Sequence, residues 1–435
     1  MTSAAYPVQL ESAADVLVVG GGTAGTIAAL QAARLGARTI LVEMGPQLGG
    51  TMTTGGVCHP GLFHAWRRQV IAGIGWELVK AAVELDSGQW PDFSVIPARH
   101  SMQQVRINGP LYAALAEEAC LQAGVSLCYY ETVVAVASDG DRWHVETAGK
   151  CLRRSIRCKQ IVDCTGDADV VGLLGLPRLR EGEIQPGTLR FALSGYDLEA
   201  MDLEDADRRW QAAVAEGQVR ASDIWERNGG FCAFLQGGGA ANHILGADST
   251  TSETWSAANI AGRQTMLRLL RFVRSLPGGE KTRLVRCAPQ TAVRETWRIL
   301  GETVITVADY RAGRVYEDAV CYAFYPVDLH DQHGVVPEPL QEGVVPTVPL
   351  RALVPVGSRN LMVAGRCLSS DRLANSALRV EATCMATGQA AGAAAALAAQ
   401  TGTTPLQVPR EDLHAALRAH GAIVPQTGAL TAREE

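Results

Sequence analysis

The feature that most constrains the fold is a glycine-rich turn near the N terminus of this 435-residue chain. Residues 20–25 read GGGTAG, directly after the short apolar run 15–19 and before the small and aliphatic residues 26–35. A second apolar run, 38–42, ends at Glu43. Unbroken apolar runs of this length are typical of parallel strands buried on both faces. The sequence therefore predicts a strand, a tight turn, a helix and a second strand, which begin a Rossmann-like α/β fold.

Each glycine of this turn has a mechanical role in the pattern G-x-G-x-x-G. Gly20 permits a sharp turn off the strand, Gly22 lets the backbone approach a pyrophosphate, and Gly25 lets the helix pack closely on the sheet. The helix is expected at 26–35, and its start offers N–H groups and a partial positive charge to phosphates. The turn predicts a dinucleotide-binding site, and the alternative is a glycine-rich turn without a ligand.

Glu43 favours the dinucleotide interpretation. It ends the second strand about 20 residues after the turn, where a carboxylate can accept hydrogen bonds from ribose hydroxyls. An acidic residue at this position argues against the extra phosphate of NADP. A glycine-rich turn without a ligand would leave the position of Glu43 unexplained.

Charge and cysteine usage exclude other classes of protein. The chain has 39 Lys and Arg against 45 Asp and Glu, a net charge of −6, which disfavours nucleic-acid binding. Its most basic run, 153–159, is interpreted as a solvated strand edge rather than a phosphate-binding patch. The 11 cysteines include no CxxC pair, which favours a reducing cytoplasm. Residues 1–12 lack the character of a signal peptide, and the run 386–399 is too short and too glycine-broken for a membrane span.

Three further segments carry a resemblance to a known family. Residues 49–56 read GGTMTTGG, residues 162–169 read VDCTGDAD, and the segment 360–392 contains AGR followed by RVEATCMATGQAAG. With these motifs the chain resembles the FAD-dependent oxidoreductases of the glutathione-reductase-like superfamily. The resemblance covers nearly the whole chain, most firmly residues 15–60 and 350–395, and it implies FAD as the cofactor.

The resemblance also implies roles for single residues. Thr165 and Gly166 would approach the adenosine side of FAD and Asp167 would bond ribityl or backbone groups, unless this segment is a simple Asx turn. Gly365 would let the chain pass close to the ribityl phosphate, and a helix starting near Thr383 would point its positive end at the flavin. The full set of expected cofactor contacts is Gly20, Gly22, Thr23, Ala24, Gly25, Glu43, Met44, Gly49, Gly50, Thr51, Val133, Thr165, Gly166, Asp167, Gly365, Arg366, Ser376, Arg379 and Thr383.

The implied fold class is α/β, with a discontinuous FAD-binding domain of glutathione-reductase type and an inserted α+β substrate domain. The FAD-binding domain comprises residues 1–186 and 347–420, the substrate domain residues 187–346, and a flexible tail residues 421–435. Strands beyond the first unit are expected at 125–130, 132–137, 143–146, 161–163, 188–194 and 360–364. Helices are expected at 110–123, 204–216, 257–276 and 381–399.

The candidate catalytic residues are polar side chains expected to face the flavin. His59 and His64 follow the second glycine loop, and each is either a general base or a structural histidine. Asp328 and His330, with Tyr325 nearby, form a histidine–carboxylate pair. That pair could accept a proton during oxidation, or it could be a hydrogen-bond network between domains.

Arg294 is suited to binding a carboxylate at two points. The alternative for Arg294 and Arg298 is an ion pair with Glu295 or Glu302. His243 is a weaker candidate of the same kind as His330.

Thiol chemistry and metal binding are expected to be absent. Cys58 and Cys384 are interpreted as small apolar fillers rather than as redox or flavin-linked thiols. His330 and His333 have a spacing that metal ligands can use, but their loop context argues against a metal site.

The leading hypothesis is an FAD-dependent dehydrogenase or oxidase. A hydride would move between a small organic substrate, of alcohol or amine type, and flavin N5, while His or Asp takes the second proton. The alternatives are C–C dehydrogenation or reduction of a carboxylate substrate, and a flavoprotein with structural FAD. No second G-x-G-x-x-G provides for NADPH, so oxygen or an external electron acceptor would reoxidise the flavin. The expected partners are substrate and acceptor, with no nucleic acid and no membrane span; the expected location is the cytoplasm, and a homodimer is left open.

Overall fold

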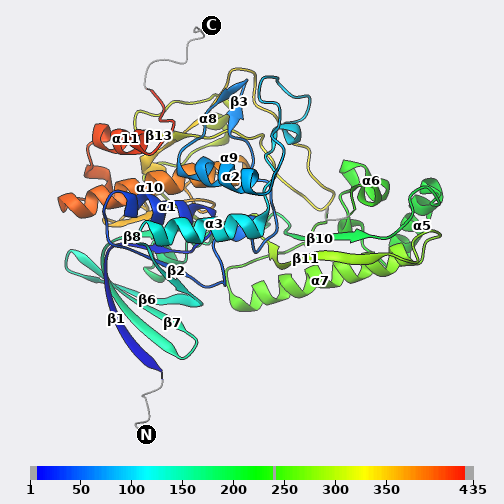
Figure 1. The fold of residues 1–435 in the computed structure, drawn as a ribbon, viewed down its shortest axis with the longest axis horizontal. Helices are drawn as coiled ribbons and strands as arrows, with labels where there is room; N and C mark the ends of the chain where they lie inside the picture. The colour runs from blue at the N-terminus through cyan, green and yellow to red at the C-terminus, as the bar shows by residue number, and fades with distance from the viewer. Residues whose placement is uncertain (1–6, 239–241, 427–435) are drawn as a thin grey trace.

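A seven-stranded sheet forms the centre of the molecule (Figure 1). The computed structural model describes residues 7–238 and 242–426. The strands are ordered β5-β2-β1-β8-β7-β6, and β15 also pairs with β8. Their bounds are β1 (Val8–Val19), β2 (Thr39–Glu43), β5 (Ser126–Tyr129), β6 (Glu131–Asp139), β7 (Arg142–Gly149), β8 (Leu152–Asp163) and β15 (Leu361–Val363).

The parallel part of this sheet comes from chain segments far apart in the sequence. β1 pairs in parallel with β2 and β8, β2 with β5, and β8 with β15. Val16 and Val18 of β1 point into one hydrophobic core, and Leu17 and Val19 point into another. Burial on both faces explains why the strand is an unbroken apolar run. The protein is therefore a mixed α/β molecule with a parallel, Rossmann-like core, as the sequence predicts.

The first half of β8 corrects one prediction. Residues 152–158 lie between β1 and β7, so the basic run 153–159 is not a strand edge. Its charged side chains alternate with the buried Ile156 and Cys158. Arg154 forms an ion pair with Glu131 at 2.9 Å. Antiparallel strands can bury one face and leave the other in water, so charged residues can alternate with buried ones along such a strand. The run is therefore basic in composition although its strand lies inside the sheet.

Two helices pack together against the sheet at very short range. These are α1 (Thr23–Arg34) and the Ala-rich α10 (Glu381–Thr401). A Cβ atom at Gly388 would lie 2.2 Å from the Ala24 carbonyl oxygen, and one at Gly392 would lie 2.2 Å from that of Ala28. Glycine is required at this crossing because the backbones themselves are in contact. The remaining helices of the main body are α2 (Ile74–Leu85), α3 (Gly109–Gln122), α4 (Asp169–Leu173), α8 (Val307–Arg311), α9 (Arg372–Leu378) and α11 (Arg410–Ala419).

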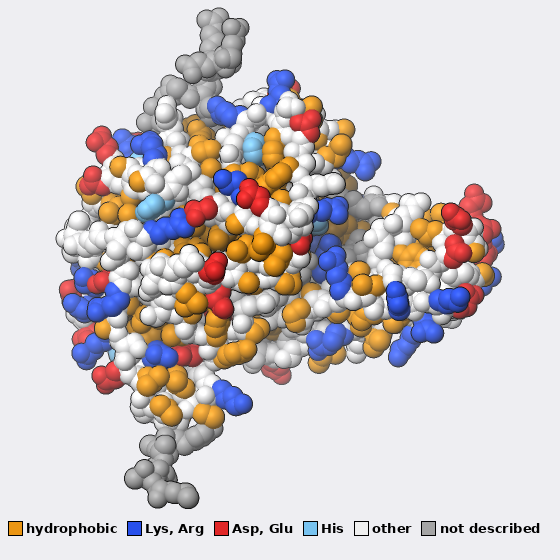
Figure 2. Space-filling view, viewed as in Figure 1, with side chains coloured by type: hydrophobic (Ala, Val, Ile, Leu, Met, Phe, Trp, Pro, Cys, Tyr) orange, Lys and Arg blue, Asp and Glu red, His pale blue; other side chains and the backbone are white. Residues whose placement is uncertain are grey.

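A lobe extends to one side of the main body (Figures 1 and 2). Its antiparallel ribbon pairs β10 (Thr188–Ser194) with β11 (Arg283–Ala292). Its own core includes Trp210 stacked on Phe231, with ring centroids 4.9 Å apart. Its helices are α5 (Leu203–Ala215), α6 (Gly230–Gly237) and α7 (Ser252–Arg274). Three small antiparallel two-stranded sheets pair β3 (His64–Ala65) with β4 (Arg68–Gln69), β9 (Arg178–Leu179) with β12 (Arg298–Ile299), and β13 (Ala319–Tyr322) with β14 (Thr347–Pro349).

The predicted strands and helices all have counterparts, but several are longer than predicted. β1 starts at Val8 and β8 at Leu152, because both extend beyond the buried core along each other. Of the predicted tail, residues 421–426 are described and Val424 is buried in the core around α10; residues 427–435 lie outside the described part. On the face shown in Figure 2, acidic and basic side chains are interspersed. Among the described residues, none of the helices combines the length and the apolar character that a membrane crossing requires.

Candidate functional site

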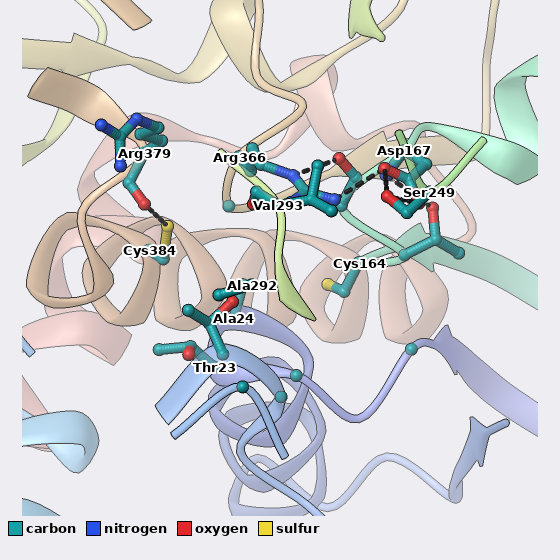
Figure 3. A pocket seen from close by; sticks show the side chains of 18 of the residues that line it. Thr23, Ala24, Cys164, Asp167, Ser249, Ala292, Val293, Arg366, Arg379 and Cys384 are labelled. Carbon is teal, nitrogen blue, oxygen red and sulfur yellow. Dashed lines mark hydrogen bonds and ion pairs between the residues drawn. The ribbon is translucent and has the colours of Figure 1, made fainter. Parts of the chain in front are cut away.

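A cavity of about 830 Å³ lies at the carboxyl ends of the parallel strands. The residues that end or follow β1, β2, β8 and β15 line it, namely Val19, Val42, Cys164 and Ala364. Residues of the lobe and of its connections complete the wall. Open parallel sheets bind their ligands outside the carboxyl ends of the strands. The cavity is therefore in the place where a dinucleotide would be expected (Figure 3).

The three glycines that define the G-x-G-x-x-G pattern, Gly20, Gly22 and Gly25, have different surroundings. A Cβ atom at Gly20, whose φ is +96°, would lie 2.5 Å from the Cys164 carbonyl oxygen. A Cβ atom at Gly25 would lie 1.8 Å from the Gly20 carbonyl oxygen. A Cβ atom at Gly22 meets no protein atom within 4 Å, and Gly22 lines the cavity. Glycine is thus required at positions 20 and 25 because any side chain would clash with the backbone of the protein itself. At Gly22 the absence of a side chain leaves space on the cavity side, which a closely approaching ligand needs.

Glu43 braces this turn from the end of β2. Its carboxylate accepts the N–H of Gly21 and the N–H of Gly45, each at 2.6 Å. Burial raises the pKa of Glu43, and these two N–H groups oppose the rise. Met44 and, from β6, Val133 line the same cavity. The predicted ribose-binding carboxylate is thus held in place beside the glycine turn.

The second glycine loop lies directly against the first. The Gly49 N–H donates to the Gly21 carbonyl at 2.8 Å, and the Thr23 hydroxyl donates to the Gly49 carbonyl at 3.3 Å. Gly50 and Thr51 line the cavity, whereas Gly49 supports the loop from behind. The two loops therefore form one continuous wall.

The turn after β8 is organised by a buried residue that the sequence did not single out. Asp163 accepts the Thr165 hydroxyl at 2.8 Å and the N–H groups of Thr165 and Val170 at 3.1 and 2.9 Å. This is an Asx turn, and it presents Thr165 and Gly166 to the cavity. An Asx turn and the predicted approach of Thr165 and Gly166 to FAD are therefore compatible.

Asp167 is the centre of a polar cluster that joins three parts of the chain (Figure 3). Its carboxylate accepts Arg366 Nη2 and the Thr296 hydroxyl, each at 2.6 Å, and the Ser249 hydroxyl at 3.0 Å. Arg366 also donates to the carbonyls of Gly166 and Val293. Asp167 and Arg366 line the cavity, but their charged groups are mainly engaged with each other and with neighbouring chain segments.

The N termini of α1 and α10 face the same cavity. Neither has a side-chain cap, and Thr23 and Ala24 of α1 and Glu381 of α10 line the wall. Two partial positive charges are thus directed at one space, which suits an anionic or electron-accepting ligand. α10 begins at Glu381, as the predicted helix 381–399 does, and Glu381 rather than Thr383 lines the cavity. Four of the predicted cofactor contacts do not line the cavity, namely Gly25, Gly49, Ser376 and Thr383.

Five polar residues next to the N terminus of α10 form what we call the polar chamber. They are His59, Arg294, Asp328, His330 and Arg379, and all line the cavity. The structure thus brings together four of the five predicted catalytic residues. The fifth, His64, is not in the lining.

A histidine chain lies in the wall of the polar chamber. His330 Nε2 is 3.2 Å from Asp328 Oδ2, and His243 Nε2 is 3.0 Å from His330 Nδ1. Burial acts to raise the pKa of Asp328, but His330, Arg379 and Arg294 outweigh it and lower the pKa to about 2. Burial, then Arg294, lowers the pKa of His330 to about 4. At pH 7 an ionised Asp328 accepts from His330 Nε2–H, and neutral His330 accepts from His243 at Nδ1.

Arg294 carries a positive charge in the wall without a carboxylate partner among the described residues. It donates to a backbone carbonyl at 2.5 Å and to the Thr188 hydroxyl at 3.0 Å. Burial lowers its pKa to about 9. The alternative ion pair with Glu295 or Glu302 is wrong for Arg294, because Glu295 is paired elsewhere, including with Arg298 at 3.5 Å. Arg294 therefore remains available to an anionic ligand.

His59 and His64 differ in position. His59 lines the cavity, and burial followed by the positive field of Arg190 lowers its pKa to about 4. His64 is stacked on Phe93 with ring centroids 3.8 Å apart and lies beside Trp76. Burial also lowers the pKa of His64 to about 4. This packing supports the alternative in which His64 is a structural histidine rather than a general base.

The Cys384 thiol is buried at the start of α10. Burial raises the pKa of Cys384, and its thiol donates to the Arg379 carbonyl at 3.1 Å (Figure 3). Within residues 7–238 and 242–426 the structure has no cluster of three or more potential metal-binding side chains.

A model of the family described as FAD dependent oxidoreductase matches residues 15–417. The chain belongs to this family. FAD is its cofactor, and the protein is an FAD-dependent oxidoreductase.

Solved structures with similarity to this FAD-dependent oxidoreductase are distant. A geranylgeranyl bacteriochlorophyll reductase-like protein from Thermoplasma acidophilum is 15% identical over 94% of this chain and 83% of its own, with a TM-score of 0.45. The p-nitrophenol 4-monooxygenase PnpA from Pseudomonas putida is 12% identical over 95% and 89%, with a TM-score of 0.41. The anhydrotetracycline hydroxylase OxyS from Streptomyces rimosus is 19% identical, with a TM-score of 0.33. That match covers 43% of this chain and only 38% of the hydroxylase.

The cavity of this oxidoreductase fits FAD on its own geometry. Space beside Gly22, two uncapped helix N termini and a carboxylate at Glu43 match the needs of a pyrophosphate and a ribose. The polar chamber would adjoin the flavin end, next to α10. When bound, FAD supplies the redox chemistry, and the protein would position it.

Several lining residues were not found from the sequence. Ser249, Trp225 and Arg190 come from the lobe, and their signal is weak because no local motif surrounds them. Glu381 was identified only as the start of a helix. The sequence carries no clear signal for Glu381, because a glutamate in the first turn of a helix usually faces water and only the tertiary fold places it in this wall.

Proposed function

We propose that this FAD-dependent oxidoreductase transfers a hydride between a small organic substrate, of alcohol or amine type, and flavin N5. The observation that carries the proposal is the polar chamber, where the buried Asp328–His330–His243 chain meets Arg294 in the wall of the cavity. Such a chamber can hold a hydroxyl or amino group and orient it, while the flavin takes the hydride.

The proposed roles follow from charge and position. Arg294 and Arg379 would bind an anionic or strongly polar part of the substrate. Asp328 would fix the tautomer of His330 in the wall of the chamber, and His59 would form a polar contact to the reacting group. The other predicted cofactor contacts would hold FAD along the strand ends, with Glu43 at a ribose.

Arg294 also favours a second candidate function. A buried guanidinium without a carboxylate partner among the described residues suits a substrate carboxylate, as in dehydrogenation or reduction of a C–C bond. The two candidates differ in the substrate that reduces the flavin.

The proposal extends to the organisation of the chain. The parallel strands come from both proposed segments of the FAD-binding domain, 1–186 and 347–420, which supports a discontinuous domain of glutathione-reductase type. The separate core of the lobe supports an inserted substrate domain within 187–346. Reoxidation by oxygen or an external acceptor and a cytoplasmic location are parts of the same proposal.

Anaerobic reduction of the purified holoprotein tests the proposed function. Alcohols and amines, including hydroxy and amino acids, are expected to bleach the flavin absorbance, whereas saturated acids are not. Bleaching by saturated acids alone would favour C–C chemistry. If no substrate of any class bleaches a protein that holds FAD, the cofactor is structural and the proposal is wrong.

A further inference from the structure

We propose that Glu381 is the catalytic base that takes the proton from the substrate hydroxyl or amine. This role rests on the proposed hydride transfer and adds a residue to it. Glu381 belongs to the first turn of α10 and is one of the residues that line the cavity, as are the five residues of the polar chamber. The Ala382 N–H, next in the chain, donates to the Pro60 carbonyl and ties the start of α10 to the loop of His59.

The side chain of Glu381 has no ion pair and no hydrogen bond with another described residue. The charged and titratable groups around it are Arg379 on its own segment, Arg294 from the connection after β11, Tyr325 from the loop before Asp328, and Cys384 one turn along α10. Burial raises its pKa to about 7, against the opposing effects of its own N–H, Arg379 and Arg294. The carboxylate therefore exchanges a proton near neutral pH, as a general base requires.

The other acid–base groups of the chamber are less suited to this step. Both ring nitrogens of His330 are engaged, with Asp328 and with His243. Asp328, with a pKa of about 2, has little affinity for a proton. His59, with a pKa of about 4, also binds a proton weakly. Glu381 is the lining group of the chamber whose proton affinity matches the task.

The step balances with FAD as the two-electron acceptor. The substrate C–H bond breaks and its hydrogen leaves with both electrons as a hydride. The O–H or N–H bond breaks and its proton passes to a carboxylate oxygen of Glu381. The carbon–oxygen or carbon–nitrogen double bond forms, and solvent later removes the proton.

The kinetic test uses the holoprotein in anaerobic stopped flow. In the wild type the limiting rate of flavin bleaching should rise with pH and level off above about pH 7, because the base must be ionised. Glu381→Gln should lower this rate by about 100- to 10,000-fold and flatten the rise. Glu381→Asp should keep a rise with pH at a lower rate. The matched control is Glu411→Gln, an exposed first-turn glutamate of α11, which should behave like the wild type.

A second readout needs no turnover. Burial also raises the pKa of Asp169 to about 7, so this readout uses an Asp169→Asn background. In that background, infrared difference spectra of the apoprotein across about pH 5.5–8.5 should show a titrating carboxyl band that Glu381→Gln removes and Glu411→Gln retains. FAD content confirms that each variant is folded. If the wild type is bleached and Glu381→Gln keeps the same rate and pH profile, the role of Glu381 is wrong and the proposed function stands. If no alcohol or amine bleaches the wild type, both are wrong. A titrating band that persists in Glu381→Gln also contradicts the role.

Discussion

At the scale of single residues, the carboxylate of Asp167 links parts of the chain that are distant in sequence. It accepts from Arg366, Thr296 and Ser249, and its ion pair with Arg366 is largely buried. Removal of one partner from a buried ion pair leaves an uncompensated charge, which costs far more than the loss of an exposed pair. Asp167 therefore contributes to stability as well as to the cavity wall.

We predict that Asp167→Asn lowers the free energy of unfolding by about 3 kcal/mol, because Arg366 then lacks its anionic partner. The matched control is Glu338→Gln, which breaks an exposed ion pair with Arg311 of the same 2.6 Å length and should cost at most about 1 kcal/mol. Urea unfolding of the apoprotein measures both. Equal effects would mean that the Asp167 cluster is not a stabilising centre.

The histidine at position 64 gives a pH-dependent prediction. Its pKa falls from 6.5 to about 4 on folding, so between these values the unfolded chain binds more protons and stability falls as pH falls. His64→Phe removes this penalty. It should reduce the loss of stability between pH 7 and pH 5 by about 1 kcal/mol, after allowance for partial solvent screening.

Urea midpoints at the two pH values measure this difference. Flavin bleaching should stay within about twofold of the wild-type rate, because His64 stacks on Phe93 outside the cavity lining. If His64→Phe greatly lowers the rate of flavin bleaching while FAD stays bound, a catalytic role for His64 must be considered again.

The sequence predicts the residues whose role is local and misses those whose role depends on distant partners. Gly20 and Gly22 follow from a turn whose chemistry is contained in six residues. The link between His243 and His330 joins positions 87 apart, and only the tertiary fold determines it. Glu381 was missed for a related reason. A glutamate in the first turn of a helix usually faces water, and only the burial of this helix end makes it unusual.

At the scale of elements, the crossing of α1 and α10 sets the geometry of the site. Gly388 and Gly392 allow backbone contact with α1, so both helices can direct their N termini at one cavity. The sequence indicates this contact through small residues, but it does not give the angle or the partner. For the basic run 153–159 the sequence gives the wrong position in the sheet. The order of strands cannot be inferred from the composition of one strand.

Two glycine substitutions in the same turn separate cofactor binding from folding. Gly22→Ala should leave the stability of the apoprotein within about 0.5 kcal/mol, because its Cβ meets no protein atom, but should weaken FAD binding at least about tenfold. Gly25→Ala should destabilise the apoprotein by about 2 kcal/mol or more, because its Cβ would overlap the Gly20 carbonyl. Urea unfolding and FAD titration measure the pair. If both variants lost stability equally, the space beside Gly22 would not be a ligand site.

At the scale of the whole molecule, the cavity is assembled from the sheet, both uncapped helix ends and the lobe. No single segment contains it, since its lining extends from Val19 to Cys384. A ligand that spans the cavity therefore stabilises the assembled chain and not its parts. Binding to the folded state alone raises stability by an amount that depends on ligand concentration and affinity.

FAD should accordingly raise the melting temperature of the apoprotein by a few degrees, corresponding to about 2.7 kcal/mol at 100 times its dissociation constant. FMN lacks the adenosine half and should give a smaller shift at equal concentration, because it cannot reach Glu43 and the flavin end together. Glu43→Gln should reduce the FAD shift toward the FMN value and leave the FMN shift unchanged. The reason is that the carboxylate braces the glycine turn through Gly21 and Gly45 at the proposed ribose end of the cavity. Equal shifts with FAD and FMN in the wild type would contradict the placement of the adenosine half at Glu43, whereas a loss of both shifts in Glu43→Gln would mean that Glu43 supports the whole cavity.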